Sequence, residues 1–314
     1  MEHFLVTGGS GFIGSHLCRT LLQDGNAVRV LDNLSSGKRE NVADIAGDID
    51  FREADLCDDA ALQRSVEGID CILHHAAVAS VQTSVEQPLL EQQTNAVGTL
   101  RLLEAARKAG VRRVVFAASA AAYGNDPRVP KREDMVPTPE SPYAISKLCG
   151  EHYCRVYSNL HGLQTVCLRY FNVYGPRQDP ASPYSGVISI FARQMLGGRA
   201  PVVFGDGLQK RDFVYVRDVV AANMLACRVE RAQGQVYNIG SGSSSSLLDL
   251  LSALNRVLES NIKADFAESR SGDVRDSLAD IDRARRELGY APATSLQEGL
   301  RDVIEWMRAA GVSS

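Results

Sequence analysis

The sequence predicts an α/β protein: a doubly wound parallel sheet, followed by a smaller α/β domain at the C-terminal side. Three observations predict this fold class. Short apolar runs alternate with longer amphipathic stretches, as in successive β-α-β units. A glycine-rich turn at residues 8–14 follows the first apolar run and leads directly into the first amphipathic stretch. Asp32 closes the second apolar run, at the carboxyl edge where such sheets bind ligands.

Each element is indicated by its own local pattern. Six short apolar runs are expected to be buried strands: residues 4–7, 27–31, 50–53, 71–74, 113–117 and 164–169. Four longer amphipathic stretches are expected to be helices: residues 13–24, 93–109, 142–160 and 296–308. Gly25 and Gly110 follow two of these helices at the position where glycine ends a helix.

The pattern changes after about residue 175, which suggests two domains. A polar, proline-containing loop at 176–183 precedes shorter and less regular elements. We therefore expect a larger domain over 1–175 and a smaller, substrate-binding domain mainly over 176–314. Segments near 213–240 are expected to return to the larger domain.

Composition excludes several classes of function. The chain has 314 residues, 45% of them hydrophobic, and a net charge of -4, so it can bury a large core but gives no support for nucleic-acid binding. No apolar run approaches the roughly 18 residues of a membrane span, and a strand begins almost at the first residue, so neither a membrane anchor nor a signal peptide is expected. The seven scattered cysteines form no CxxC pair, which favours a reduced, cytoplasmic protein without a metal site.

The glycine-rich turn is a candidate dinucleotide site. Gly8 and Gly11 allow a tight turn and close approach to a pyrophosphate, and Gly14 allows the helix to pack closely on the strand. Asp32 suits the ribose 2′-hydroxyl and repels a 2′-phosphate, so NAD is favoured over NADP. A glycine turn of purely structural use is the alternative, and its context after a strand and before a helix disfavours that reading.

Tyr143 and Lys147 are the candidate catalytic pair, together with Ser119. Their spacing places both side chains on one face of the predicted helix. A lysine ammonium beside a tyrosine is expected to lower the tyrosine pKa, which makes a base that works near neutral pH. Taken with a dinucleotide, this indicates hydride chemistry at an alcohol or ketone carbon. Each residue alone could be a helix cap or a surface residue, but the combination makes that unlikely.

With these motifs, Asn95 and the segment 168–177 (LRYFNVYGPR), the whole chain resembles the extended short-chain dehydrogenase/reductase family. Within it the chain is most similar to the NAD-dependent UDP-sugar 4-epimerases of the UDP-N-acetylglucosamine/UDP-glucose group. The resemblance implies a Rossmann-type domain, tightly bound NAD and a homodimer built by helix packing. It also implies reversible inversion of a UDP-hexose at C4 through a 4-keto intermediate, with Ser119, Tyr143 and Lys147 as catalytic residues.

The remaining site residues combine motif position and resemblance. The predicted NAD-binding residues are Gly8, Gly11, Phe12, Ile13, Gly14, Asp32, Asn33, Ser36, Gly37, Asp55, Leu56, His75, Ala76, Ala77, Asn95, Tyr143, Lys147 and Tyr170. The predicted substrate-binding residues are Ser80, Ser119, Ala121, Asn172, Val187, Phe204, Arg211, Arg270, Asp273 and Ser277. Among them, two arginines suit a diphosphate because each guanidinium offers paired donors.

Two departures from related enzymes narrow the reaction. Related dehydratases and decarboxylases carry an acid just after the catalytic Ser or Thr, whereas Ala120 and Ala121 stand here, so elimination would lack its proton donor. In the family, a tyrosine at the position of Ser277 blocks an N-acetyl group at C2, and serine leaves room for it. Both UDP-GlcNAc/UDP-GalNAc and UDP-Glc/UDP-Gal therefore remain open as substrates.

Other activities remain as alternatives. A UDP-glucuronate 4-epimerase or another NAD-dependent nucleotide-sugar modifying enzyme has the same core motifs. A simple dehydrogenase would release reduced cofactor to solution. A scaffold that kept the fold and lost catalysis is disfavoured, because Ser119, Tyr143 and Lys147 are all present.

Overall fold

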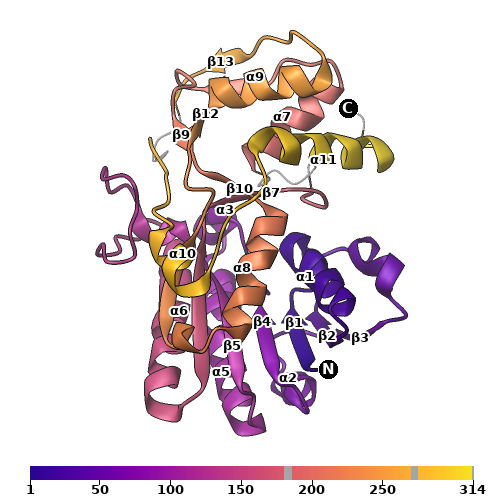
Figure 1. Cartoon of the computed structure of the whole chain (residues 1–314), viewed down its shortest axis with the longest axis vertical. Coiled ribbons are helices and arrows are strands. Elements are labelled where there is room, and N and C mark those ends of the chain that lie inside the picture. The colour runs from indigo at the N-terminus through magenta and orange to yellow at the C-terminus, as the bar shows by residue number, and fades with distance from the viewer. Residues whose placement is uncertain (180–185, 270–274, 313–314) are drawn as a thin grey trace.

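The computed structural model describes residues 1–179, 186–269 and 275–312. Figure 1 shows a larger part built on the central sheet and a smaller part that carries α7, α9 and α11. No helix in the described ranges is long and apolar enough to cross a membrane. Over the same ranges, no group of His, Cys, Asp and Glu side chains gathers in a way that could hold a metal ion.

A seven-stranded parallel sheet forms the centre, which confirms the predicted fold class. Its strand order is β11-β6-β5-β4-β1-β2-β3. The strands are β1 (His3–Thr7), β2 (Ala27–Asp32), β3 (Ile49–Glu53), β4 (Cys71–His74), β5 (Arg113–Ser119), β6 (Gln164–Tyr170) and β11 (Gln235–Ile239). Thr7 lies opposite His74, and Ser119 lies opposite Tyr170, so the carboxyl ends of these strands share one edge.

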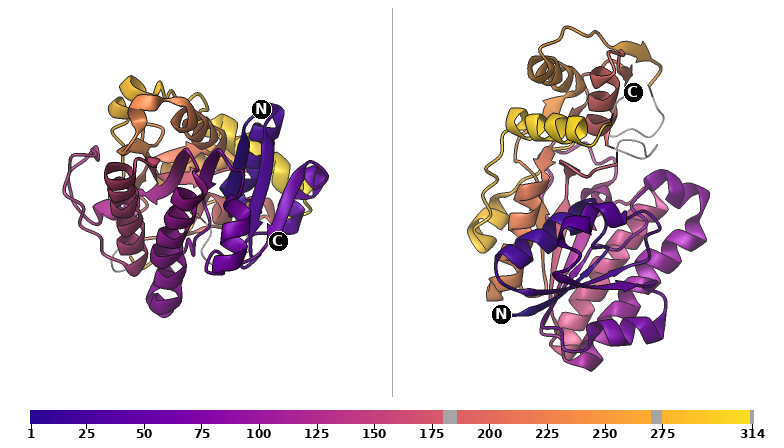
Figure 2. Two further views of the ribbon diagram at one scale, coloured as in Figure 1. Left: turned by 90° about the horizontal axis from the view of Figure 1, so that it is seen from below. Right: turned by 90° about the vertical axis from the view of Figure 1, so that its right-hand side faces the viewer.

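Helices cover both faces of the sheet (Figure 2). One face carries α1 (Phe12–Gln23) and α8 (Val216–Arg228), and the other carries α2 (Asp59–Val66), α5 (Gly98–Ala109) and α6 (Pro142–His161). Side chains alternate between the faces, as a strand requires: Phe4 and Val6 enter the core beneath α1 and α8, and Leu5 enters the opposite core. The buried apolar runs of the sequence thus supply both layers of packing.

The helical region before α5 differs from the single helix expected over 93–109. Two short helices, α3 (Val81–Glu86) and α4 (Pro88–Gln92), lead into a π-helical turn, η2 (Gln93–Val97), and only then does α5 begin. Helix α2 is short and was not predicted from the sequence. The side chain of Asp58 starts it by accepting hydrogen bonds from the backbone N–H groups of Ala60 and Ala61.

The smaller part gathers around a third core. Helices α7 (Val187–Leu196), α9 (Leu247–Leu258) and α11 (Leu296–Ala309) pack on one another. Capping boxes start two of them, Ser246 with Asp249 for α9 and Ser295 with Glu298 for α11. Three strand pairs complete this part: β7 (Asn172–Tyr174) with β10 (Phe213–Tyr215), β9 (Lys210–Arg211) with β12 (Ser245–Ser246), and β8 (Val202–Phe204) with β13 (Asp265–Ala267).

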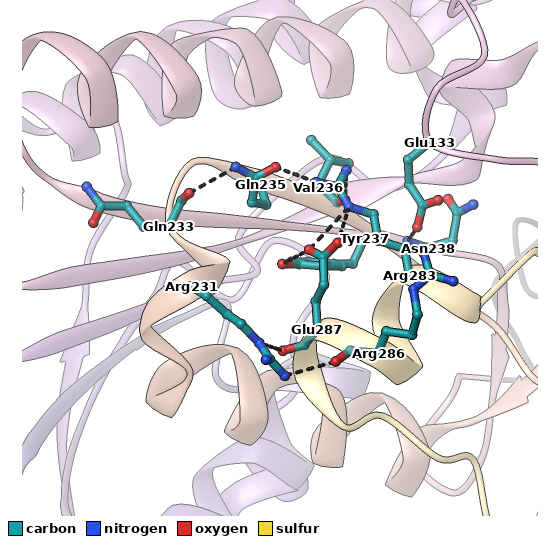
Figure 3. A network of polar contacts seen from close by, with 10 residues as sticks. All are labelled: Glu133, Arg231, Gln233, Gln235, Val236, Tyr237, Asn238, Arg283, Arg286 and Glu287. Atoms are coloured by element: carbon teal, nitrogen blue, oxygen red, sulfur yellow. Dashed lines mark hydrogen bonds and ion pairs between the residues drawn. The ribbon is translucent and has the colours of Figure 1, made fainter.

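Late segments of the chain return to the sheet. Strand β11 pairs with β6, and α10 (Asp282–Leu288) packs against β11. Figure 3 shows the polar contacts that hold α10 there. Arg283 lies 5.2 Å from the centre of the Tyr237 ring, and the Tyr237 hydroxyl donates to Glu287 at 2.9 Å. Arg231, in the turn that precedes β11, donates to the Glu287 carbonyl at 2.6 Å. Helix α10 is therefore held both by β11 and by that turn.

Gly150 sets the distance between α6 and β5. A Cβ built on Gly150 would lie 2.4 Å from Cζ of Phe116, far inside normal contact. The Phe116 side chain is only 2% exposed and belongs to the core, so its ring has nowhere to move. The absence of a side chain at Gly150 therefore lets the helix approach the sheet.

Gly150→Ala is expected to lower the free energy of unfolding by about 1–3 kcal/mol, because overpacking outweighs the roughly 1 kcal/mol by which alanine favours a helix. Gly47→Ala is the matched control, since an added Cβ there meets nothing within 4 Å, and it should stay within about 0.5 kcal/mol of the parent. Chemical denaturation measures both variants. Equal stability of the two would mean that α6 shifts away from β5 without cost.

Candidate active site

The glycine loop between β1 and α1 is packed too tightly for side chains. Gly8 adopts a φ of 70°, and its N–H donates to the carbonyl of Leu31 at 2.9 Å. A Cβ on Gly8 would lie 2.8 Å from the backbone nitrogen of Ala76, and one on Gly14 would lie 2.1 Å from the Gly8 carbonyl oxygen. These approaches hold the loop against the turn after β4 and against the first turn of α1.

The start of α1 fits a phosphate-bearing ligand. Gly11 is the N-cap and provides no side-chain cap, and the first turn carries no acidic residue. The first N–H groups of the helix and its positive dipole end are therefore available to an anion. Within the described part of the chain, the buried hydroxyl of Ser10 has no hydrogen-bond partner. A loop that only glycine can form, with open donors beside it, fits the pyrophosphate of a dinucleotide.

Asp32 connects the glycine loop to the loop after β2. Its two carboxylate oxygens accept hydrogen bonds from the backbone N–H groups of Ser10 and Leu34, both at 2.8 Å. Burial raises the pKa of Asp32, and these two donors oppose the shift. Three further predicted NAD-binding residues lie in the loop after β2. The Asn33 side chain donates to the Asp55 carboxylate at 2.7 Å, and Ser36 is exposed. A Cβ built on Gly37 would lie 2.9 Å from Oδ2 of Asp32.

Loops from the smaller part reach the same region. The Lys38 ammonium lies 2.7 Å from the Asp179 carboxylate. On α1, Nε2 of His16 lies 2.9 Å from the carbonyl oxygen of Pro176. The segment after β7 therefore lies against α1 and the loop after β2. Phe12 and Ile13, in the first turn of α1, are half-buried and pack against the third core, which belongs to the smaller part.

The turn after β4 forms the opposite side of the predicted cofactor site. Nε2 of His75 lies 2.9 Å from the Tyr170 hydroxyl, and the two rings stack with centres 5.9 Å apart. Burial lowers the pKa of His75 to about 3, so the ring is neutral at neutral pH. Ala76 and Ala77 follow as half-buried small residues. The side chain of Leu56, by contrast, packs in the core beside Gly98.

Asn95 lies in the π-helical turn and holds the chain that follows β4. Its Oδ1 accepts from the Val78 N–H at 2.8 Å, and its Nδ2 donates to the Val78 carbonyl at 3.0 Å. Two residues further on, Ser80 caps α3 by accepting from the Thr83 N–H at 2.9 Å. π-Helical turns occur often at functional sites, and this one aims the Asn95 amide at the backbone of the predicted cofactor wall.

Ser119, Tyr143 and Lys147 come together at the carboxyl edge of the sheet. Ser119 ends β5, and its Oγ accepts from the Ala121 N–H at 3.1 Å. Tyr143 and Lys147 lie in the first turns of α6, which Ser141 caps by accepting from the Ala144 N–H at 3.2 Å. The Ser119 side chain lies close enough to Tyr143 to lower the pKa of its hydroxyl through hydrogen bonding.

Lys147 reaches back to β5 and not to the tyrosine hydroxyl. Its Nζ donates to the Ala117 carbonyl at 2.9 Å and lies 5.9 Å from the centre of the Tyr143 ring. The side chain is 5% exposed. Burial lowers the pKa of Lys147 to about 8, and Glu91 opposes this shift.

The sequence predicted a lowered pKa for Tyr143, and this prediction was wrong, because the pKa is raised. Burial raises the pKa, the hydrogen bond with Ser119 lowers it, and the Glu91 carboxylate raises it again. Sequence spacing correctly puts the lysine one turn away, but it says nothing about desolvation, which is here the largest influence on the Tyr143 pKa.

A second group of predicted residues surrounds the backbone of Asp212. Asn172 donates to the Asp212 carbonyl through its backbone N–H at 3.1 Å and its side chain at 3.0 Å. Arg211 directly precedes Asp212, and one of its nitrogens donates to the Lys210 carbonyl at 3.0 Å. The Ser277 N–H donates to the same Lys210 carbonyl, also at 3.0 Å. Asn172, Arg211 and Ser277 thus meet on one short piece of backbone.

The Asp212 side chain fixes this group, although sequence reasoning missed it. Its fully buried carboxylate accepts from Ser241 at 2.7 Å, and from the N–H groups of Gly242 and Ala279, both at 3.1 Å. Burial raises the pKa of Asp212, and these donors oppose the shift. The position of Asp212 directly after Arg211, a predicted substrate-binding residue, was the sequence signal that could have identified it.

The other predicted substrate residues are more scattered. Ala121 lies in the turn after Ser119, Val187 starts α7, and Phe204 ends β8. Arg270 and Asp273 lie outside the described residues.

Comparisons with known proteins agree with this geometry. A UDP-glucose 4-epimerase from Mycolicibacterium smegmatis is 42% identical over 308 residues, which cover 97% of this chain and 98% of that protein. The solved UDP-glucose 4-epimerase of Thermotoga maritima, with UDP-glucose, has a TM-score of 0.94 at 40% identity, covering 98% of this chain and 99% of that one. A UDP-N-acetylglucosamine 4-epimerase from Methanobrevibacter ruminantium, in complex with UDP-N-acetylmuramic acid, has a TM-score of 0.95 at 38% identity, with the same coverage.

The sequence model of the NAD dependent epimerase/dehydratase family matches residues 4–240. That range contains the glycine loop, Asp32, Ser119, Tyr143 and Lys147. The match confirms the resemblance to extended short-chain dehydrogenases/reductases, and the chain belongs to the NAD dependent epimerase/dehydratase family.

Proposed function

We propose that this protein interconverts the C4 epimers of a UDP-hexose, with NAD held between the glycine loop and the turn after β4. The observation that carries the proposal is the meeting of Ser119, Tyr143 and Lys147 at the carboxyl edge of the sheet, where the glycine loop also lies. Relatives named as UDP-sugar 4-epimerases, aligned over nearly the whole chain, support it.

Tyr143 is the base of the proposed reaction. It takes the proton from the sugar C4 hydroxyl, and Ser119 hydrogen-bonds the same oxygen and relays the proton. NAD, when bound, would supply a reversible acceptor for the C4 hydride. With the 4-keto sugar turned over in the site, addition of the hydride to its other face, with Tyr143 returning the proton, would invert C4. The reaction brings no net oxidation.

Lys147 provides the positive charge that this base requires. Burial raises the pKa of Tyr143, so the phenolate forms readily only beside a positive charge. The Lys147 ammonium is buried, held on the Ala117 carbonyl, and mostly charged at neutral pH because its pKa is about 8. Its charge acts through the low-dielectric interior, where screening by water is weak.

The nucleotide sugar is proposed to span both parts of the molecule. We divide the chain into two domains. The NAD-binding domain consists of residues 1–175 together with α8 and β11, and the smaller substrate-binding domain consists mainly of the rest of residues 176–314. Asn172, Arg211 and Ser277, held around Asp212, suit the sugar-phosphate region because they offer an amide, a guanidinium and a small side chain. Ser277 leaves space for an N-acetyl group at C2, so both UDP-GlcNAc and UDP-Glc are proposed substrates.

We also infer a cytoplasmic homodimer. Apolar side chains remain exposed on α3, α4 and α6, which pack on one another: Val85 61%, Leu89 85%, Ile145 51%, Val156 42% and Leu160 73%. An apolar helical face of this kind supports pairing with a second copy about a twofold axis. All seven cysteines are free thiols, as in a reducing compartment.

Tyr143→Phe is expected to lower kcat by about 10²–10⁴-fold, because it removes the general base and leaves the ring. Tyr153→Phe, on the same helix, is the matched control and should keep kcat within about twofold. NMR at the sugar C4 measures inversion of UDP-Glc, UDP-GlcNAc and UDP-glucuronate. Full activity in Tyr143→Phe contradicts the mechanism, and no inversion of any substrate by the unaltered protein contradicts the function.

Ser277→Tyr is expected to abolish turnover of UDP-GlcNAc and to spare UDP-Gal, because the ring would overlap only the N-acetyl group. Ser277→Ala controls for loss of the hydroxyl and should turn over both sugars. The ratio of kcat/KM for the two substrates is the measurement. An unchanged ratio in Ser277→Tyr would rule out the proposed position of Ser277 beside C2.

Val156→Glu combined with Leu160→Glu is expected to convert the dimer to a monomer, since two charges would enter an apolar contact. Leu208→Glu changes an equally apolar residue, 52% exposed, in the smaller part, and should leave the dimer intact. Light scattering coupled to size-exclusion chromatography gives the mass of each. A monomeric parent protein at micromolar concentration would refute the inferred dimer.

A further inference from the structure

Glu91 is a fully buried acid beside the catalytic residues that the mechanism above does not use. It belongs to α4, between the π-helical turn and α6, and its relative exposure is 0%. A carboxyl group in such a place is costly unless neighbouring groups stabilise it.

Hydrogen-bond donors surround the Glu91 carboxyl. Its Oε1 accepts from the Ser146 hydroxyl at 2.5 Å and also from Nδ2 of Asn95. Its Oε2 accepts from Nε2 of Gln92 at 2.9 Å. These contacts satisfy both carboxylate oxygens.

These contacts link Glu91 to the catalytic turn of α6. Ser146 directly precedes Lys147, and its hydroxyl lies 3.0 Å from the carbonyl oxygen of Tyr143. Gln92 donates to the carbonyl of Pro142, the first residue of α6, at 2.9 Å. Glu91 therefore joins α4 to the turn that carries the base and the lysine.

Among the residues that the structure describes, Lys147 forms no ion pair. Its ammonium donates to the neutral Ala117 carbonyl and lies over the Phe116 ring at 5.1 Å. His74 at the end of β4 and His75 directly after it also lie within reach of its charge, and burial keeps the pKa of each well below neutral, so both are uncharged. Tyr143 is a further titratable neighbour, and the Glu91 charge acts on both Tyr143 and Lys147.

We propose that Glu91 is a positioning residue that supplies the buried counter-charge of Lys147 and clamps the first turn of α6. This inference rests on the proposed function for its effect on turnover, although the electrostatic part stands on the protein alone. Glu91 opposes the effect of burial on the Lys147 pKa, in the direction that a counter-charge requires.

The sign of the expected pH effect follows directly. Lys147 is charged below its pKa and neutral above it. Loss of the Glu91 charge removes a favourable interaction of the ammonium, so the Lys147 pKa falls. The alkaline limb of turnover should then move to lower pH, because the phenolate loses its positive neighbour sooner.

The direct test is a titration of Lys147 by NMR. The protein as purified is labelled at lysine Cε, and the Lys147 signal is assigned by its loss in Lys147→Met. Glu91→Gln keeps an oxygen for Ser146 and Asn95, but it removes the charge together with the oxygen that accepts from Gln92. The Lys147 midpoint should therefore fall by at least about half a pH unit. Gln92→Leu removes a neutral donor to the same carboxylate and is the matched control, with no comparable fall expected.

Two further variants separate charge from packing. Glu91→Asp keeps the charge and should keep most of the Lys147 midpoint. Glu91→Met replaces the carboxylate by an apolar chain of similar length and serves in place of Glu91→Gln if that variant does not fold. A midpoint unchanged in the uncharged variant, or lowered as far by aspartate as by glutamine, overturns the proposal.

Turnover gives the second readout. In Glu91→Gln the alkaline limb of kcat should shift with the Lys147 midpoint, whereas a merely structural role lowers kcat at every pH and leaves the limb in place, which would overturn the proposal. If the unaltered protein inverts no UDP-sugar, the proposed function fails, and the NMR titration still decides the role of Glu91.

Discussion

The arrangement of the proposed catalytic residues depends on how closely α6 approaches β5. Gly150 meets the Phe116 ring without a side chain between them, and one turn earlier Lys147 bonds to the Ala117 carbonyl. Both contacts run from the helix to the same strand, and that strand ends at Ser119. The meeting of Ser119 with Tyr143 is therefore a consequence of helix-to-strand packing. A helix displaced outward by one methyl group would separate them.

Buried acids organise the loops around this centre. Asp32 joins the glycine loop to the loop after β2, and Asp212 gathers the backbone near Asn172 and Arg211. Each carboxylate is held by backbone N–H groups, whose positions change little once the fold has formed. Glu91 differs because side-chain donors surround it, and because a buried lysine lies near. The first two acids shape the site, and the third also sets its charge.

The parts of the molecule that could be predicted from the sequence are those encoded locally. Strand and helix patterns gave the parallel sheet, and the glycine turn, Asp32 and the Tyr143/Lys147 spacing identified the family. The roles assigned to individual site residues stay predictions, and Arg270 and Asp273 lie outside the described residues.

What the sequence could not reveal depends on contacts between distant segments. Glu91 accepts a hydrogen bond from Ser146, which is 55 positions away in the sequence. Asp212 accepts one from Ala279, which is 67 positions away. A π-helical turn at Asn95 stands where a regular helix was predicted, and no local residue pattern indicated it. The Tyr143 pKa went against expectation because spacing gives proximity to a lysine but not the degree of desolvation.

The link between the two halves of the proposed site is unusually short. Tyr170 stacks on His75 at the cofactor side, and Asn172 bonds to Asp212 at the sugar side. Only Phe171 stands between them, itself 6% exposed and tied to the Ile239 carbonyl at 3.0 Å. The covalent chain therefore fixes the spacing between the proposed cofactor side and the proposed sugar side of the site. An insertion here would move one half of the proposed site relative to the other.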